Sequence, residues 1–207
     1  QQSDLILLGG GGLFHDYWGT TEENVLTQSH SGISFYSDFP ILAALYKKPC
    51  ILYSIGVGPL LTEAGKNLTR VSFENADIAT VRDIESLNLL QELEIATNNI
   101  KITADPAFNL HSDRKRASEI LKGVQRKGSP LVAVSLRNWA VENSTEAWKR
   151  EIADALDLFS EKYNATFVFI PLQSSSLSPL TDDLAIAKNI TGMMKNSDQA
   201  IILQDVM

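Results

Sequence analysis

Short apolar runs alternate along the chain with longer stretches in which apolar residues recur every three or four positions. The short runs are continuously apolar instead of alternating with polar residues, a pattern typical of parallel strands that are covered on both faces. These runs predict seven strands, at residues 4–8, 50–55, 78–81, 100–103, 131–136, 166–170 and 200–203. Because helical patterns lie between them, the sequence predicts an α/β fold with parallel sheets.

Two of the helical stretches carry residues that mark a helix boundary. Pro40 lies in the segment FYSDFPILAALYKK, and we expect it near the start of a helix or at a kink, because proline lacks an N–H group. Asp83 stands directly before the stretch IESLNLLQELE, and its carboxylate is suited to cap that helix. In the second stretch the apolar residues recur every three or four positions, the spacing of a helix that packs with one face.

A polar segment at residues 111–130 interrupts the pattern and ends in Gly-Ser-Pro. We place a domain boundary near residues 112–130 because charged and turn-forming residues gather there. The prediction is two Rossmann-like parallel-sheet domains, an N-terminal one at residues 1–115 and a C-terminal one at residues 128–207. Both are expected to be partial, with the chain truncated at both ends, because it begins and ends in strand-like runs.

Composition narrows the function classes. The 207 residues are 44% hydrophobic and 21% charged, which is ordinary for a globular protein with a core. A net charge of -7 argues against broad binding to nucleic acid, which requires a basic face. The single cysteine excludes an intramolecular disulfide bond. Since there is neither a signal peptide nor an apolar run long enough to span a membrane, we expect a cytoplasmic location.

Candidate chemistry lies after the strands, because ligands of open parallel sheets bind beyond the carboxyl ends of the strands. Four glycines at positions 9–12 follow the first strand, and their bare backbone would let an anion or a sugar approach closely. They match neither the dinucleotide-binding nor the P-loop fingerprint, so a tight turn with positive φ is an equal alternative. Asp16 either caps a helix or contacts a substrate hydroxyl, and His15 is either a base or structural.

Two arginines and a glutamine follow later strands. Arg82 ends the third strand, where its guanidinium suits a carboxylate or phosphate; the alternative is a surface pair with Asp83. Arg137 ends the fifth strand. Gln173 follows the sixth strand with several hydroxyl residues, which either bind a phosphate or sugar or form a loop. Because the sequence contains no HExxH, CxxC or Ser/His/Asp motif at recognised spacing, we expect no metal site.

Five segments occur in a characteristic order: SDLILLGGGGLFHD, KKPCILYSIGVGPL, ADIATVRDIESLNLLQEL, ITADPAF and VAVSLR. In this order the chain resembles the polysaccharide pyruvyl transferase family, which includes CsaB-type cell-wall enzymes. The resemblance is specific over residues 3–137 and looser over residues 138–207. It implies a two-domain fold like that of GT-B glycosyltransferases. It also implies transfer of a pyruvyl group from phosphoenolpyruvate, without a further cofactor, to a glycan or lipid-linked sugar acceptor as a pyruvate ketal. A homo-oligomer is compatible with it.

The resemblance also implies roles for individual residues. Arg137 matches the arginine of the SLR segment and is expected to bind the donor's phosphate or carboxylate during catalysis. Arg82 matches the arginine of the VRD segment and is expected to contact a second anion or the acceptor. Asp16 matches the acid after the glycines, a hydroxyl contact or catalytic base. The remaining expected substrate contacts are Gly10, Gly11, Gly12 and, from its place after the sixth strand, Gln173.

Two further motifs of the family are expected outside these residues, an Asn-x-Gly-Asp turn before Gln1 and an Arg-Leu-His motif after Met207. We therefore interpret the chain as the central portion of an enzyme. Two other functions fit the same fold, since fold does not determine function. One is a glycosyltransferase that uses a nucleotide-sugar donor, and the other is a binding module without catalysis.

Overall fold

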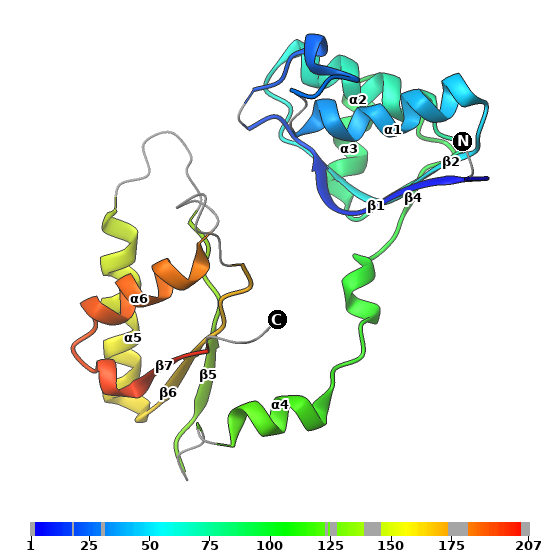
Figure 1. Ribbon diagram of the computed structural model, residues 1–207. Coiled ribbons are helices and arrows are strands. Elements are labelled where there is room, and N and C mark those ends of the chain that lie inside the picture. The colour runs from blue at the N-terminus through cyan, green and yellow to red at the C-terminus, as the bar shows by residue number, and fades with distance from the viewer. Residues whose placement is uncertain are drawn as a thin grey trace. The chain divides into compact units, whose positions relative to one another are not determined.

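The computed structural model describes residues 3–17, 19–29, 32–122, 124, 128–138, 146–173 and 182–203. The chain forms two compact units, Gln1–His111 and Ser112–Met207 (Figure 1). Each unit combines a parallel sheet with helices. The helix α4 (Arg114–Leu121), which the sequence assigned mainly to the boundary region, lies in the second unit.

The first unit contains a four-stranded parallel sheet in the order β1-β2-β3-β4. Its strands are β1 (Ile6–Phe14), β2 (Cys50–Val57), β3 (Ile78–Val81) and β4 (Lys101–Ile102). Its α-helices are α1 (Ile33–Tyr46), α2 (Glu63–Glu74) and α3 (Ile84–Glu92), and short 3-10 helices occur at Glu22–Asn24 and Pro106–Asn109. Phe14, Leu52, Ile55, Val81 and Leu90 are fully buried between the sheet and these helices.

The helices cover one face of this sheet. Sequential parallel strands joined by right-handed crossovers carry all their helices on the same face, as α1, α2 and α3 do (Figure 1). On the other face, Leu7 and Ile78 are 58% and 54% exposed within the described residues, and both pair in register with Ile51. The expectation of strands covered on both faces is therefore wrong for this part of the sheet.

The first strand is longer than the sequence predicts. β1 continues through the four glycines and stays paired with β2 up to Phe14, so the alternative of a tight turn at these glycines is wrong. Gly10 and Gly11 do adopt the positive φ values expected of a turn, 80° and 95°. Their φ region is open to glycine at no steric cost, and β1 stays paired with β2 through these residues. The register shifts only between Gly12 and Phe14.

The helix boundaries agree with the sequence at Asp83 and differ at Pro40. The side chain of Asp83 accepts a hydrogen bond of 2.8 Å from the N–H of Ser86, which confirms it as the cap of α3. Pro40 lies in the interior of α1, so the expected position near the helix start is wrong, and the alternative of a kink stays a prediction. Its ring is buried, and we infer that this packing offsets the hydrogen bond that proline cannot donate.

The second unit contains a three-stranded parallel sheet in the order β5-β6-β7. Its strands are β5 (Leu131–Val134), β6 (Thr166–Phe169) and β7 (Ala200–Ile202), and a 3-10 helix spans Ser197–Gln199. Two longer helices, α5 (Ala147–Tyr163) and α6 (Asp183–Met193), bury a core that includes Phe167, Phe169 and Ile190. All seven predicted strands are thus present, although several end earlier than predicted.

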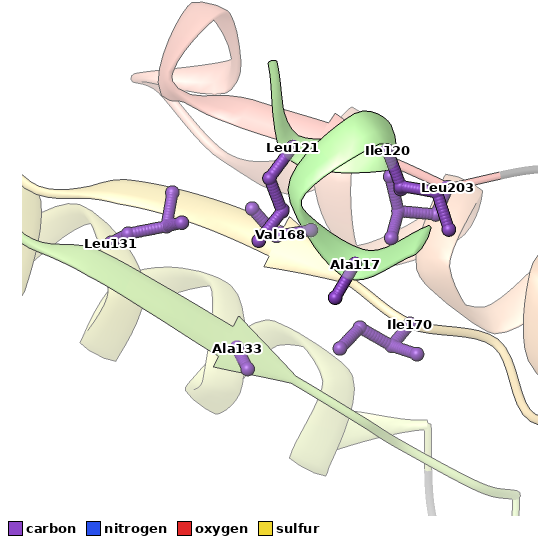
Figure 2. A pocket seen from close by; sticks show the side chains of 8 residues that line it. All are labelled: Ala117, Ile120, Leu121, Leu131, Ala133, Val168, Ile170 and Leu203. Atoms are coloured by element: carbon purple, nitrogen blue, oxygen red, sulfur yellow. The ribbon is translucent and has the colours of Figure 1, made fainter. Parts of the chain in front are cut away.

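Helix α4 lies over the opposite face of this sheet (Figure 2). None of its residues is buried, so it covers the strands loosely. An apolar cavity of about 260 Å³ remains beneath it. The residues that line it are Ala117, Ile120, Leu121, Leu131, Ala133, Val168, Ile170 and Leu203.

A buried carboxylate ties α5 to the segment after α6. Asp157 is 2% exposed, and its two oxygens accept hydrogen bonds of 2.8 and 2.9 Å from the backbone N–H groups of Lys195 and Asn196. A buried carboxylate is tolerated where donors satisfy it in this way. Asp157 therefore determines how the connection from α6 to β7 leaves the helix layer.

We expect the Asp157→Asn substitution to lower the free energy of unfolding by about 1–3 kcal/mol, because the amide group presents a donor to one of the two N–H groups. The matched control is Asp154→Asn in the same helix, where the side chain is half-exposed and pairs with Arg150. We expect it to change stability by about 0.5 kcal/mol or less. Hydrogen exchange of the Lys195 and Asn196 amides measures the effect, and unchanged protection in Asp157→Asn would contradict it.

Candidate functional site

Arg82 lies at the carboxyl end of β3, and its guanidinium rests on the backbone of two glycines. A Cβ atom added to Gly56 would lie 2.6 Å from Nε and 2.7 Å from Cζ of Arg82. A Cβ atom added to Gly12 would lie 3.3 Å from Nη2. Gly12 and Gly56 are register partners on β1 and β2, so the two strands together form a floor that only glycine leaves open.

The charge of Arg82 is only partly compensated. Its Nε atom lies 3.2 Å from Oδ2 of Asp83, and both side chains are 37% exposed. Within the described residues neither Nη atom has a hydrogen-bond partner. The surface pair with Asp83 is therefore present, yet the outer edge of the guanidinium still offers donors in the geometry that suits a carboxylate or phosphate.

Asp83 remains ionised beside Arg82. Burial raises the pKa of its carboxyl group, but the hydrogen bonds from Ser86 and Arg82 outweigh burial and lower it overall. A carboxyl whose pKa is lowered by folding contributes stability above its ordinary pKa and loses it as the pH falls through the lowered value. The cap of α3 and the pair with Arg82 are therefore intact at neutral pH.

Asp16 is buried and faces the segment that leads into α2. Its Oδ1 accepts a hydrogen bond of 2.6 Å from the N–H of Leu61. Its Oδ2 accepts bonds of 2.8 and 2.5 Å from the N–H and hydroxyl of Thr62, the residue that caps α2. With an exposed fraction of 2% and both oxygens occupied, Asp16 is placed to hold α2. This geometry favours a positioning role over the hydroxyl contact or base suggested by the sequence.

Gly65 makes the burial of Asp16 possible. A Cβ atom at this position in the first turn of α2 would meet Oδ2 of Asp16 and lie 2.8 Å from its Cγ. The N–H of Gly65 also donates to the hydroxyl of Thr62, at 3.0 Å. The sequence offered no signal for this role, since the two partners are far apart along the chain.

His15 lies beside Asp16 at the end of the glycine strand. Burial lowers the pKa of its imidazole, and the charge of Asp16 raises it by less. The ring centroid lies 5.1 Å from that of Tyr17. The net lowering keeps the imidazole mainly neutral at neutral pH. His30, the next histidine along the chain, lies outside the described residues.

The second unit brings Arg137, Gln173 and Asp183 together. Nη2 of Arg137 donates a hydrogen bond of 2.6 Å to Oε1 of Gln173. The backbone N–H of Gln173 donates to Oδ2 of Asp183 at 3.0 Å, and Oδ1 of Asp183 lies 3.6 Å from Nε of Arg137. The sequence named the first two residues but missed Asp183; its position at the start of a helix that follows the sixth strand was the available signal.

The three glycines predicted to contact a substrate have different surroundings. Gly12 contacts the Arg82 side chain, whereas Gly10 lies near Pro106, whose Cγ would be 3.7 Å from an added Cβ. Position 11 requires glycine because its φ value is 95°, a region that side chains disfavour. Each glycine thus has a structural reason of its own, and direct contact of Gly10, Gly11 or Gly12 with a substrate remains a prediction.

The described part of the chain contains no cluster of three histidine, cysteine, aspartate or glutamate side chains placed to hold a metal ion. None of its helices combines the length and apolar character that crossing a bilayer requires.

The two α/β units with parallel sheets give the chain a GT-B-like fold, and each unit has an arginine at the carboxyl ends of its strands. The family model described as polysaccharide pyruvyl transferase matches residues 2–204. The chain therefore belongs to the polysaccharide pyruvyl transferase family.

A solved structure is similar in fold. It is a UDP-GlcNAc 2-epimerase from Methanocaldococcus jannaschii, with a TM-score of 0.57 and 13% sequence identity. The match covers 99% of this chain and 51% of that chain, so this chain spans about half the length of the epimerase. At this identity the likeness concerns the fold alone. Comparison with curated protein sequences gives no significant match.

We expect Gly56→Ala to destabilise the first unit by about 1–3 kcal/mol, because the new methyl group displaces the Arg82 guanidinium. In an Arg82→Ala background most of this cost should disappear, since the displaced group is absent. A double-mutant cycle by denaturant unfolding measures the coupling. An equal cost in both backgrounds would show that something other than Arg82 requires the glycine.

We expect Gly65→Ala to destabilise the protein by about 1–3 kcal/mol, although alanine is the better helix former by about 1 kcal/mol. The reason is the collision with the buried carboxylate of Asp16. Gly192→Ala in α6 is the matched control, because an added Cβ there meets no atom within 4 Å. Thermal unfolding compares the two, and a Gly65→Ala protein as stable as the control would disprove the assigned role.

Proposed function

We propose that this protein transfers the pyruvyl group of phosphoenolpyruvate to two hydroxyl groups of a sugar in a polysaccharide, forming a cyclic ketal. The proposal rests on membership of the polysaccharide pyruvyl transferase family over residues 2–204. The observation that carries it is Arg137, a half-exposed guanidinium held by Gln173 and Asp183 where β5 ends. Ligands of parallel sheets bind at this end of the strands.

The donor explains the need for arginine. Phosphoenolpyruvate carries a phosphate and a carboxylate, and a planar guanidinium binds either group through two parallel hydrogen bonds. In this proposal Arg137 binds the donor, and Arg82 binds a second anionic group or the acceptor. Gln173 orients Arg137 through Oε1 and retains its side-chain amide N–H groups for the substrate.

The reaction balances without an oxidant or reductant. A proton adds to the methylene carbon of the enol, and positive charge develops at C2. One sugar hydroxyl bonds to C2, the C–O bond to phosphate breaks, and a second hydroxyl closes the ring. Of the two protons that the hydroxyls lose, one replaces the proton spent on the methyl group and the other leaves with phosphate. Arg137 stabilises the charge that develops on the departing phosphate.

The test uses the protein that carries this chain, with phosphoenolpyruvate and a panel of glycan and lipid-linked acceptors. We expect phosphate release that depends on the acceptor, together with a ketal methyl signal in the NMR spectrum of the product. Absence of both across the panel would refute the proposal. Thermal protection by UDP- or GDP-sugars, but not by phosphoenolpyruvate, would instead indicate a nucleotide-sugar glycosyltransferase.

We expect Arg137→Ala to weaken phosphoenolpyruvate binding at least about tenfold, because a charge-assisted pair is lost. The matched control is Arg150→Ala in the same unit, where the guanidinium pairs with Asp154 at 2.9 Å on the surface of α5. Calorimetric titration compares the dissociation constants. Equal affinity in the Arg137→Ala protein would remove Arg137 from the donor site.

A further inference from the structure

Asp183 is buried at the start of α6, and one of its carboxylate oxygens accepts no hydrogen bond from the described residues. The residue is 3% exposed, and its Oδ1 has no hydrogen-bond partner among the described residues. A buried carboxylate is costly unless a charge or donors compensate it. The cation that compensates Oδ1 is Arg137, whose Nε lies 3.6 Å away.

Three segments close a ring of contacts around this carboxylate. Oδ2 of Asp183 accepts the backbone N–H of Gln173, and the side chain of Gln173 accepts a bond from Nη2 of Arg137. The ion pair between Arg137 and Asp183 completes the ring. The end of β5, the end of β6 and the start of α6 are thereby joined through side chains and one backbone group.

The ring restricts the orientation of one guanidinium. It occupies Nε and one N–H of Nη2, so Nη1 and the second N–H of Nη2 face away from Asp183. Arginine otherwise rotates freely about several bonds, and ordering it on binding costs entropy. A guanidinium that is already ordered in the folded protein binds an anion more tightly, because it loses less conformational entropy on binding.

We propose that Asp183 is a positioning residue that holds Arg137 and Gln173 in the orientation that receives the anionic donor. The inference rests on the proposed function for the identity of that donor. Asp183 acts through Arg137 and does not itself contact the substrate, because it is 3% exposed and its Oδ1 lies 3.6 Å from Nε of the guanidinium.

The two effects of the Asp183 charge on anion binding have opposite signs, and this makes the proposal testable. A carboxylate near a guanidinium repels an incoming anion, so its removal would tighten binding if repulsion dominated. If positioning dominates, its removal frees the guanidinium and weakens binding. The direction of the change therefore decides between the two.

The experiment compares Asp183→Asn with Asp182→Asn in the protein that carries this chain. Asp182 caps α6 through Oδ1, a role that asparagine also performs, so this neighbour controls for loss of one charge at the same helix start. We expect Asp183→Asn to raise the dissociation constants of phosphoenolpyruvate and inorganic phosphate about tenfold, and Asp182→Asn to leave them within about twofold. Unchanged or tighter binding in Asp183→Asn would overturn the proposal.

A second measurement does not depend on substrate. NMR of the Arg137 Nε–H group reports its order and exchange, and we expect faster exchange in Asp183→Asn than in the wild type or in Asp182→Asn. If the wild type fails to bind phosphoenolpyruvate, the proposed function fails, while the exchange rates still test the positioning role. If Asp183→Asn does not fold, Asp183→Glu keeps the charge and alters only its reach, and unchanged exchange and phosphate affinity there would count against positioning.

A double-mutant cycle separates positioning from a general structural effect. In an Arg137→Ala background we expect Asp183→Asn to cause no further loss of phosphate affinity, because the residue it positions is absent. A full additional loss would show that Asp183 acts on binding by another route and would overturn the proposal.

Discussion

The carboxyl end of the first sheet depends on one close contact, in which the Arg82 guanidinium lies on the backbone of Gly12 and Gly56. The contact requires the register of β1 and β2, since the two glycines are direct partners. A slip by one residue would separate the two glycines and turn every side chain of the strand to the other face. The contact therefore requires the strand register, the two glycines and the arginine together. β1 brings Gly12 to Gly56 by continuing through Gly10 and Gly11, which have positive φ values.

The two units hold an arginine at corresponding places by different means. In the first unit a bare backbone supports Arg82, and Asp83 at the cap of α3 pairs with it. In the second unit side chains surround Arg137, and the acid is Asp183 in the first turn of α6. In both, the acid stands at the start of a helix, α3 for Asp83 and α6 for Asp183, where backbone N–H groups favour negative charge. The result in each unit is a guanidinium with one edge held by these contacts and with further N–H groups that no described residue binds.

The sequence predicted elements better than it predicted their ends. Continuous apolar runs identified all seven strands, because burial of a strand is visible in its own residues. The end of β1 was missed, since it depends on pairing with β2 some forty residues later in the chain. Pro40 lies inside α1 instead of near its start for a related reason: its buried position is supported by packing that local preference does not encode. At the candidate site, Arg82, Arg137 and Gln173 were named from their places after strands, whereas Gly56, Gly65 and Asp183 act through distant partners.

By itself the sequence determined the fold class, the order of the strands along the chain and the family, because apolar runs, capping residues and motif order are local properties. Only the tertiary structure decided what the glycines and acids do. Gly12 and Gly56 make room for an arginine from a third strand, and Gly65 makes room for the buried carboxylate of Asp16. Asp16 and Asp183 hold other residues in place from buried positions. These roles depend on contacts between segments that come together only when the chain folds. They therefore cannot be predicted from the spacing of residues along the chain.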